Sequence, residues 1–106
     1  MVNNSKETLS IIRKSVISLF PDCRVLLFGS RARNDNSAES DYDFLVITKN
    51  TLDIHKKRFY KSQLRKELAK YKIPADILIQ SEEEVRQKKK ITGHILREVI
   101  KEGIAI

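Results

Sequence analysis

The segments that decide the fold are Arg24-Val25-Leu26-Leu27-Phe28-Gly29-Ser30 and, after ten intervening residues, Asp41-Tyr42-Asp43-Phe44-Leu45-Val46-Ile47-Thr48. Each contains a short apolar run that is typical of a buried strand. Residues 31–40 between them are polar and turn-forming, with room for one helical turn at their start. A connection this short does not suit a full crossover helix, so we expect a mixed sheet rather than an all-parallel one.

Other elements are predicted around these two strands. Apolar residues recur at helical spacing over residues 5–20, 52–72 and 94–101. Ser5 is a suitable N-cap, and Ser81 with Glu84 forms a capping box that starts another helix. Pro74 introduces a third strand over residues 75–80. The order predicts an α/β domain in which a small mixed sheet is flanked by helices.

Several finer expectations follow from the same periodicity. The inward-facing residues of the second helix are predicted to be Tyr60, Leu64, Leu68 and Tyr71. Those of the last helix are predicted to be Ile95, Leu96, Val99 and Ile100. Gly103 suits the residue that ends this helix, and residues 104–106 suit a short edge strand.

Composition limits the possible classes. With 106 residues, we expect one compact domain over residues 1–106. No segment is apolar for long enough to span a bilayer, and the first residues lack the order of a signal peptide, so we expect a cytoplasmic protein. Cys23 is the only cysteine, which excludes an internal disulfide and favours a half-buried structural role. His55 and His94 have no partner at ligand spacing and are interpreted as surface or packing residues.

The two aspartates of the second strand carry the first chemical signal. Residues two apart in a strand point to the same face, so the carboxylates of Asp41 and Asp43 should lie side by side. A divalent cation such as Mg²⁺ would remove their repulsion. Asp76 sits in an otherwise apolar strand that is expected to pack in the core, where a lone carboxylate would be costly. If that strand lies beside the second one, the three carboxylates could hold two metal ions about 4 Å apart.

Gly29-Ser30 provides the second signal. A glycine at the end of a buried strand lets the backbone approach a phosphate, and the following N–H groups form an anion-binding concavity. The Ser30 hydroxyl can donate to a phosphate oxygen, and Arg31 or Arg33 can neutralise further charge. A helix N-cap is the simpler role for Ser30, and either arginine could merely be solvated. Metal cluster and phosphate cradle together predict a nucleotide site.

These motifs resemble the signature of the DNA polymerase β-type nucleotidyltransferase superfamily, in which Gly-Ser is followed by Asp-x-Asp and a later strand aspartate. The Gly29-Ser30-Arg31-Ala32-Arg33 stretch and the ending Leu96-Arg97-Glu98 to Glu102-Gly103-Ile104 are similar to its minimal nucleotidyltransferases. Asn34 departs from the glycine that is common there, although asparagine tolerates left-handed backbone geometry.

The resemblance implies the polymerase β-type fold and two Mg²⁺ ions. Asp41 and Asp43 would bind both ions, and Asp76 would bind the catalytic one and help to activate an acceptor hydroxyl. Ser30 would contact the triphosphate of ATP or another NTP. The hydroxyl would attack the α-phosphorus and release pyrophosphate.

A chain this small leaves few residues to enclose a base and an acceptor, so a partner or a homodimer is expected to complete the cleft. The resemblance points to a HEPN-type helical toxin, with this chain as an antitoxin that transfers AMP to a toxin tyrosine.

Two other functions stay open. The first is an antitoxin with a spent site that acts by binding alone. The second is a nucleic-acid-binding module, suggested by the net charge of +7 and the basic runs at 56–72 and 88–90. No aromatic residues alternate with those runs in a stacking pattern, which argues against the second.

Overall fold

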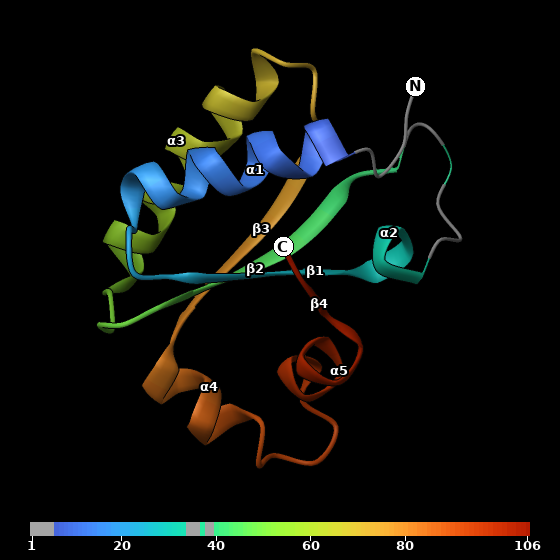
Figure 1. Ribbon diagram of the computed structural model, residues 1–106. Coiled ribbons are helices and arrows are strands. Elements are labelled where there is room, and N and C mark those ends of the chain that lie inside the picture. Colours follow the sequence, from blue (N-terminus) through green and yellow to red (C-terminus); the bar gives the residue numbers. More distant parts are fainter. Residues whose placement is uncertain (1–5, 34–36, 38–39) are drawn as a thin grey trace.

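The computed structural model describes residues 6–33, 37 and 40–106. Within these ranges the chain forms a sheet covered by helices on both faces (Figure 1). The elements in chain order are α1 (Lys6–Leu19), β1 (Arg24–Phe28), α2 (Gly29–Arg33), β2 (Tyr42–Thr48), α3 (Ile54–Ala69), β3 (Ala75–Ser81), α4 (Glu82–Lys88), α5 (Ile95–Glu102) and β4 (Ile104–Ala105). Ser5 and Asn34, which carried two of the predictions, lie outside the described residues.

The sheet is mixed, as predicted. Its strand order is β3-β2-β1-β4, and β1 runs antiparallel to both β2 and β4, whereas β2 and β3 are parallel. The antiparallel register places Phe28 opposite Asp43, and the parallel register places Asp43 opposite Asp76. The third strand therefore lies beside the second, which was the condition for bringing the three aspartates together.

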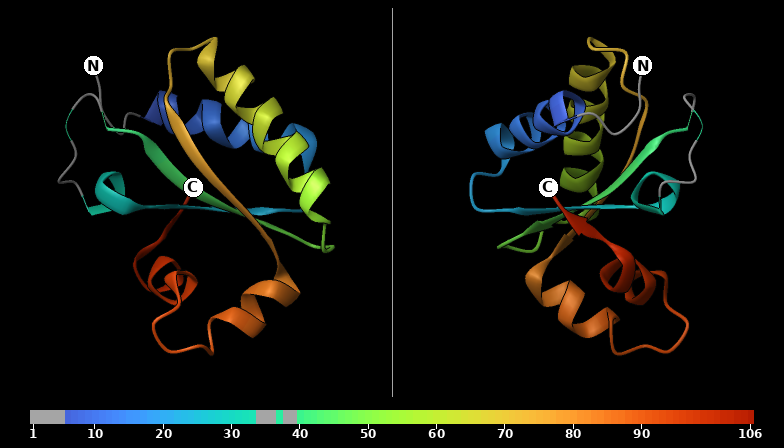
Figure 2. Two further views of the ribbon diagram at one scale, coloured as in Figure 1. Left: turned by 180° about the vertical axis from the view of Figure 1, so that it is seen from behind. Right: turned by 45° about the vertical axis from the view of Figure 1, so that its right-hand side comes forward.

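Helices α1 and α3 cover one face of the sheet, and α4 and α5 cover the other (Figures 1 and 2). Phe44 and Val46 of β2 belong to the core under α1 and α3, while Leu45 and Ile47 belong to the core under α4 and α5. All four side chains are completely buried. A strand that is buried on both faces has no polar side to present, which explains the continuous apolar run in β2.

Three of the helices have a side chain as their N-cap. The Asp53 carboxylate accepts from the Lys56 N–H at the start of α3, and Ser81 and Glu84 form the predicted capping box at the start of α4. At α5 the cap is His94, whose Nδ1 accepts from the Leu96 N–H at 3.1 Å. This capping role was not predicted, because histidine is not among the residues that usually signal a helix start.

Two predicted core residues are exposed instead. Tyr71 is 53% exposed because α3 ends at Ala69, so the helical stripe does not extend to it. Ile95 is 62% exposed at the first position of α5, where Leu96 and Val99 provide the buried contacts.

Gly103 ends α5 as predicted, but with a φ of −67° that any residue adopts. Glycine is needed there because a Cβ would lie 2.6 Å from the Val99 carbonyl oxygen.

No helix among the described residues combines the length and the apolar character needed to cross a membrane.

Candidate functional site

Three strands end or begin at one corner of the sheet. The carboxyl end of β1 meets the amino ends of β2 and β3 there, and the register aligns Phe28, Asp43 and Asp76 across them. Asp43 alternates with Tyr42 and Phe44, whose side chains pack under α1 and α3, so its carboxylate is directed to the α4/α5 face. We call Gly29, Asp41, Asp43 and Asp76 the carboxylate corner.

Gly29 is shaped by its contact with Asp43. Its φ is +74°, a left-handed conformation that strongly favours glycine. A Cβ at this position would lie only 2.4 Å from Asp43 Oδ2 and 3.2 Å from Asp43 Cγ. The carboxylate therefore occupies the space that any other residue would need for its side chain. From the sequence this glycine was expected to serve phosphate contact alone, and the space taken by Asp43 is an additional reason for it.

The surroundings of Asp43 disfavour the negative charge of its carboxylate. Burial raises the pKa of its carboxyl above the ordinary value of 3.8, and the nearby negative charges of Asp76 and then Asp41 raise that pKa further. Arg33 acts in the opposite direction but does not cancel these effects. The partly buried Asp43 therefore lies close enough to Asp76 and Asp41 for their negative charges to disfavour its own.

Asp76 is placed differently from the prediction. Its side chain is 66% exposed, so the expectation of a carboxylate buried in the core was wrong. The strand buries Ile77 and Ile79, but Asp76 lies at its solvent-facing start, ahead of these positions. Its Oδ1 lies 3.9 Å from Arg65 Nη2 of α3, at the outer limit of an ion pair. The alignment of Asp76 with Asp43 therefore supports a metal site here. The free-energy cost of burying the Asp76 carboxylate gives no such support, because this side chain is exposed.

The arginines of α2 occupy two different positions. Arg31 is only 3% exposed, and its Nη2 and Nε donate to the Ser40 carbonyl oxygen at 2.7 and 3.1 Å. Its guanidinium also lies 3.9 Å from the centre of the Tyr42 ring. These contacts connect α2 with the residues on either side of Asp41. Phosphate contact by Arg31 stays a prediction, and the geometry favours a role in holding the start of β2.

Arg33 and Ser30 are closer to what a phosphate would need. Arg33 is exposed, and its Nη1 lies 3.3 Å from Glu102 Oε1 at the end of α5. Its positive charge also acts on Asp43. Ser30 is half-buried at the second position of α2, directly after Gly29. Both remain predicted phosphate ligands.

The donor set of the carboxylate corner suits a divalent cation. Within residues 6–33, 37 and 40–106, no three metal-binding side chains are gathered into a preformed cation site. The raised pKa of Asp43 nevertheless shows a carboxylate whose ionised form has too little positive charge around it. Mg²⁺ prefers oxygen ligands and keeps open positions for phosphate oxygens, so Asp41, Asp43 and Asp76 fit as its ligands.

Arg65, which approaches this corner at Asp76, and Glu102, which contacts Arg33, were not singled out from the sequence. A helical period indicates which residues are buried but not which flank of the helix faces a site.

A groove of about 450 Å³ between α1 and α3 is lined by residues such as Ser15, Gln63 and Tyr71. It contains no residue of the carboxylate corner and plays no part in the site.

Known proteins are similar to this chain in sequence or in fold. A protein of Methanocaldococcus jannaschii, provisionally named a protein adenylyltransferase, is 30% identical over 106 residues, which cover all of this chain and 95% of the relative. A provisionally assigned nucleotidyltransferase from Sulfolobus solfataricus has the same fold, with a TM-score of 0.61 and 22% identity over 93% of this chain and 76% of its own.

Two toxin–antitoxin structures also share the fold. One contains AMP-PNP and matches with a TM-score of 0.61 and 20% identity, over 91% of this chain and 69% of its own. The other is a tri-AMPylated HEPN toxin of Shewanella oneidensis in complex with its MNT antitoxin. It matches with a TM-score of 0.57 and 16% identity, over 94% of this chain and 69% of its own. Residues 9–104 match the model of the nucleotidyltransferase domain, so this chain belongs to that family and is a nucleotidyltransferase.

Proposed function

We propose that the chain transfers AMP from ATP to a hydroxyl of a partner protein in a Mg²⁺-dependent reaction, and that the partner is a HEPN-type toxin modified on a tyrosine. The carboxylate corner is the observation that carries this proposal. Asp43 touches the space beside the glycine that opens α2 and is aligned with Asp76 on the neighbouring strand. Asp41 lies just before β2, and the negative charges of Asp76 and Asp41 both oppose that of Asp43. A metal-bound triphosphate would relieve that repulsion.

Each residue would have a defined task. Asp41 and Asp43 would hold the cations, which neutralise the triphosphate and the charge that develops during transfer. Ser30 and Arg33 would contact phosphate oxygens. Asp76 would accept the proton of the acceptor hydroxyl as its oxygen bonds to the α-phosphorus, and the bond between the α- and β-phosphates would break to release pyrophosphate. Arg31 would hold the start of β2 through Ser40 and Tyr42.

The similar proteins support the choice of acceptor. The name of the M. jannaschii relative gives a protein as its acceptor, and one of the similar structures contains an AMPylated HEPN toxin. Asp76 is exposed at the side of the sheet, so a hydroxyl on a protein surface can approach it. A second copy of the chain is the other candidate for completing the site.

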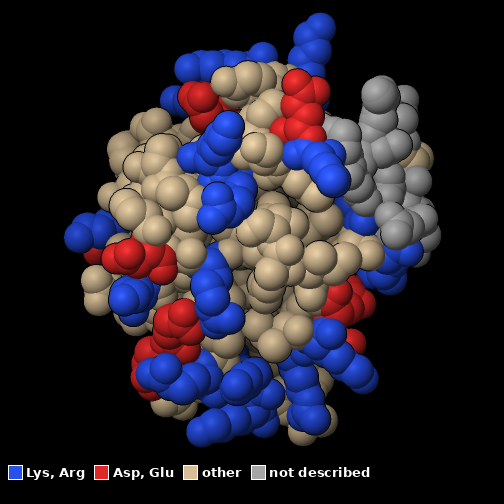
Figure 3. Space-filling view, viewed as in Figure 1, with Lys and Arg blue, Asp and Glu red and all other residues tan. Residues whose placement is uncertain are grey.

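Two further functions compete with this proposal. In one, the chain neutralises a toxin by contact and the site is spent. The carboxylate corner argues against that, because a site without a ligand would gain stability by losing one of its opposed charges. In the other, the chain binds nucleic acid. Lys and Arg side chains gather at the lower end of the face in Figure 3, over α4 and α5, but this gives general attraction to anions rather than a specific site.

The proposal is tested by transfer of label from α-labelled ATP to the protein encoded beside this chain, with and without Mg²⁺. The control is the Asp41→Asn/Asp43→Asn variant, with folding checked by circular dichroism. We expect label on a partner tyrosine only with Mg²⁺ and intact aspartates. Tight binding of the partner without any transfer would favour the contact antitoxin, and label on this chain itself would favour the homodimer.

A further inference from the structure

A row of basic side chains follows the outer edge of β3. Lys57, Lys61 and Arg65 recur every four residues along one flank of α3, and Arg58 lies three residues before Lys61 and seven before Arg65. We call them the basic rim. Helix α3 runs alongside β3 when the molecule is seen from behind (Figure 2, left).

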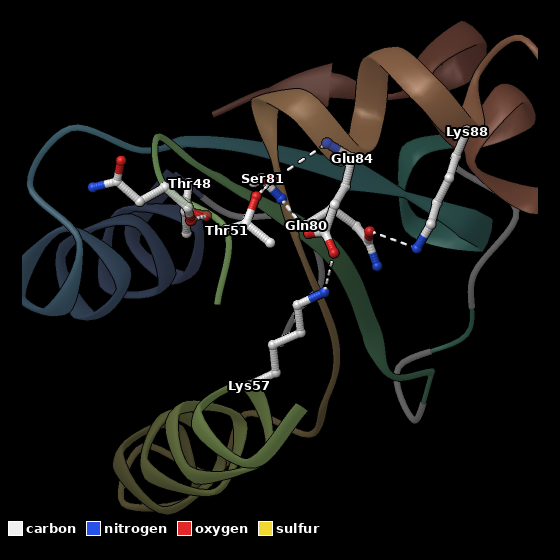
Figure 4. Close-up of polar contacts among 8 residues, drawn as sticks. Thr48, Thr51, Lys57, Gln80, Ser81, Glu84 and Lys88 are labelled. Atoms are coloured by element: carbon white, nitrogen blue, oxygen red, sulfur yellow. Dashed lines mark hydrogen bonds and ion pairs between the residues drawn. The ribbon is translucent and has the colours of Figure 1, made fainter. Parts of the chain in front are cut away.

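Ion pairs at both ends determine where the rim lies. Lys57 Nζ is 2.8 Å from Glu84 Oε2, just beyond the carboxyl end of β3 (Figure 4). Arg65 lies 3.9 Å from Asp76, near the amino end of the same strand. The rim therefore follows β3 over most of its length and ends at the carboxylate corner.

The middle of the rim has unused positive charge. Neither Arg58 nor Lys61 forms an ion pair with any residue that the structure describes. The only acidic residue within α3 is Glu67, which pairs with Lys70 away from the rim. Arg65 shares Asp76 with the proposed metal site, so metal binding would leave its guanidinium available as well.

The strand beside the rim is also open. β3 is the last strand of the sheet, and no described strand pairs with its outer edge. An edge strand presents backbone N–H and C=O groups to which an extended peptide can add. Alternate side chains of such a peptide are about 6.7 Å apart, close to the ~5.4 Å between successive turns of a helix. Acidic residues at alternate positions would therefore meet successive basic residues of the rim.

We propose that the basic rim and the open edge of β3 form the docking surface for the acceptor, and that the acceptor presents an extended acidic segment. This inference rests on the proposed function and adds its substrate class. The segment would lie along β3 and bring the hydroxyl that follows it to Asp76, from the side opposite the nucleotide contacts on α2. A single-stranded nucleic acid fits less well, because the exposed ring of Phe59 lies on another flank of α3 and gives the rim no stacking partner.

The test uses the full chain and two fluorescent peptides, each with one tyrosine. One peptide has glutamates at alternate positions, and the other has glutamines instead. Binding is measured by fluorescence anisotropy without ATP for wild type, for Arg58→Glu/Lys61→Glu and for Lys56→Glu/Lys66→Glu. The last variant is the matched control, because it makes the same charge change on other flanks of the same helix. Thermal unfolding confirms that both variants fold.

We expect the rim variant to bind the acidic peptide about tenfold more weakly at low ionic strength, and the control to change by less than about twofold. The glutamine peptide should bind weakly to all three proteins. Equal losses in the two variants would overturn the inference, because they would reflect net charge alone. Rim-dependent binding of oligothymidylate that is tighter than that of the acidic peptide would also overturn it.

The same variants separate this inference from the proposed function. AMP transfer to the natural partner that is unaffected in the rim variant would contradict the docking surface and leave the reaction intact. Rim-dependent peptide binding without transfer to any acceptor would support the docking surface and contradict the proposed reaction.

Discussion

Two carboxylates of this protein lie at opposite ends of the same parallel strand pair. Asp43 belongs to the carboxylate corner, and Glu84 follows the other end of β3. Glu84 Oε1 accepts from the Ser81 N–H and Oε2 accepts from Lys57 Nζ, both at 2.8 Å (Figure 4). The Ser81 hydroxyl accepts in turn from the Glu84 N–H and lies 2.8 Å from the Thr51 hydroxyl. We call Thr51, Lys57, Ser81 and Glu84 the polar corner.

Burial acts on both carboxylates, but their pKa values move in opposite directions. Burial alone would raise the pKa of Glu84, yet the hydrogen bonds from Lys57 and Ser81 and the charges of Lys57 and Lys88 lower it below the ordinary 4.5. Burial raises the pKa of Asp43, and Asp76 and Asp41 add to the rise. The polar corner supplies its own counter-charges, whereas the carboxylate corner requires a ligand to supply them. This difference distinguishes a structural polar cluster from a binding site.

The largest effect is expected for Asp43→Asn. Removing this carboxylate should lower the rate of AMP transfer at least about 100-fold, because the charge that holds the metal-bound triphosphate is lost. Stability should stay the same or increase, because the repulsion with Asp41 and Asp76 disappears. Transfer rates and urea denaturation measure the two effects. An active variant, or one that is strongly destabilised, would place Asp43 with the structural polar groups.

Gly29→Ala should destabilise the protein by changing the geometry of the carboxylate corner. The new Cβ would be held in a left-handed conformation and would displace the Asp43 carboxylate, at a cost of about 2–4 kcal/mol in the free energy of unfolding. Gly93→Ala is the matched control. Gly93 also has a positive φ, of 83°, but a Cβ there meets nothing within 4 Å. We expect about 1 kcal/mol for the control in the same denaturation experiment. Equal losses would mean that the contact with Asp43 is unimportant.

Ser81→Ala tests the polar corner. Loss of the hydroxyl removes the N-cap of α4 and leaves Thr51 without this contact, so the free energy of unfolding should fall by about 1 kcal/mol. AMP transfer should be unchanged, because Ser81 lies at the end of β3 away from Asp76. A large loss of transfer with normal stability would extend the active site to this corner.

The smallest effect is the dependence of stability on pH. The pKa of Asp43 is higher in the folded protein than in the unfolded one, so its contribution to stability falls as the pH rises from about 3.8 through the folded value. The lowered pKa of Glu84 has the opposite sign: its contribution is complete above about 4.5 and is lost as the pH falls through the folded value.

Denaturation of wild type, Asp43→Asn and Glu84→Gln across this range measures both contributions. The stability of wild type relative to Asp43→Asn should decrease with rising pH, and that relative to Glu84→Gln should increase. Slopes of the same sign would contradict the distinction between the two corners.

Much of the fold follows from local patterns in the sequence. The bounds of β1 and the capping box of α4 were predicted because buried strands and helix caps leave local signals. Tyr71 and Ile95 were wrongly predicted to be buried, because a periodic pattern does not show at which residue a helix ends or which of its turns is exposed to solvent.

The candidate site was predictable in part. The sequence left open whether β3 lies next to β2, and the parallel register of these two strands is what places Asp43 opposite Asp76. The exposure of Asp76 was missed, because it depends on where the helices stop covering β3. The contacts of Arg31 with Ser40 and of Arg65 with Asp76 are tertiary, and no spacing in the sequence indicates them.

The most direct test compares the free energy of unfolding of wild type and Asp43→Asn, each with and without Mg²⁺ and ATP. The carboxylate corner predicts that the variant is at least as stable as wild type without ligand, and that only wild type gains stability when both Mg²⁺ and ATP are present. A variant that is less stable without ligand, or one that gains as much as wild type with it, would contradict the assignment of this corner as the nucleotide site.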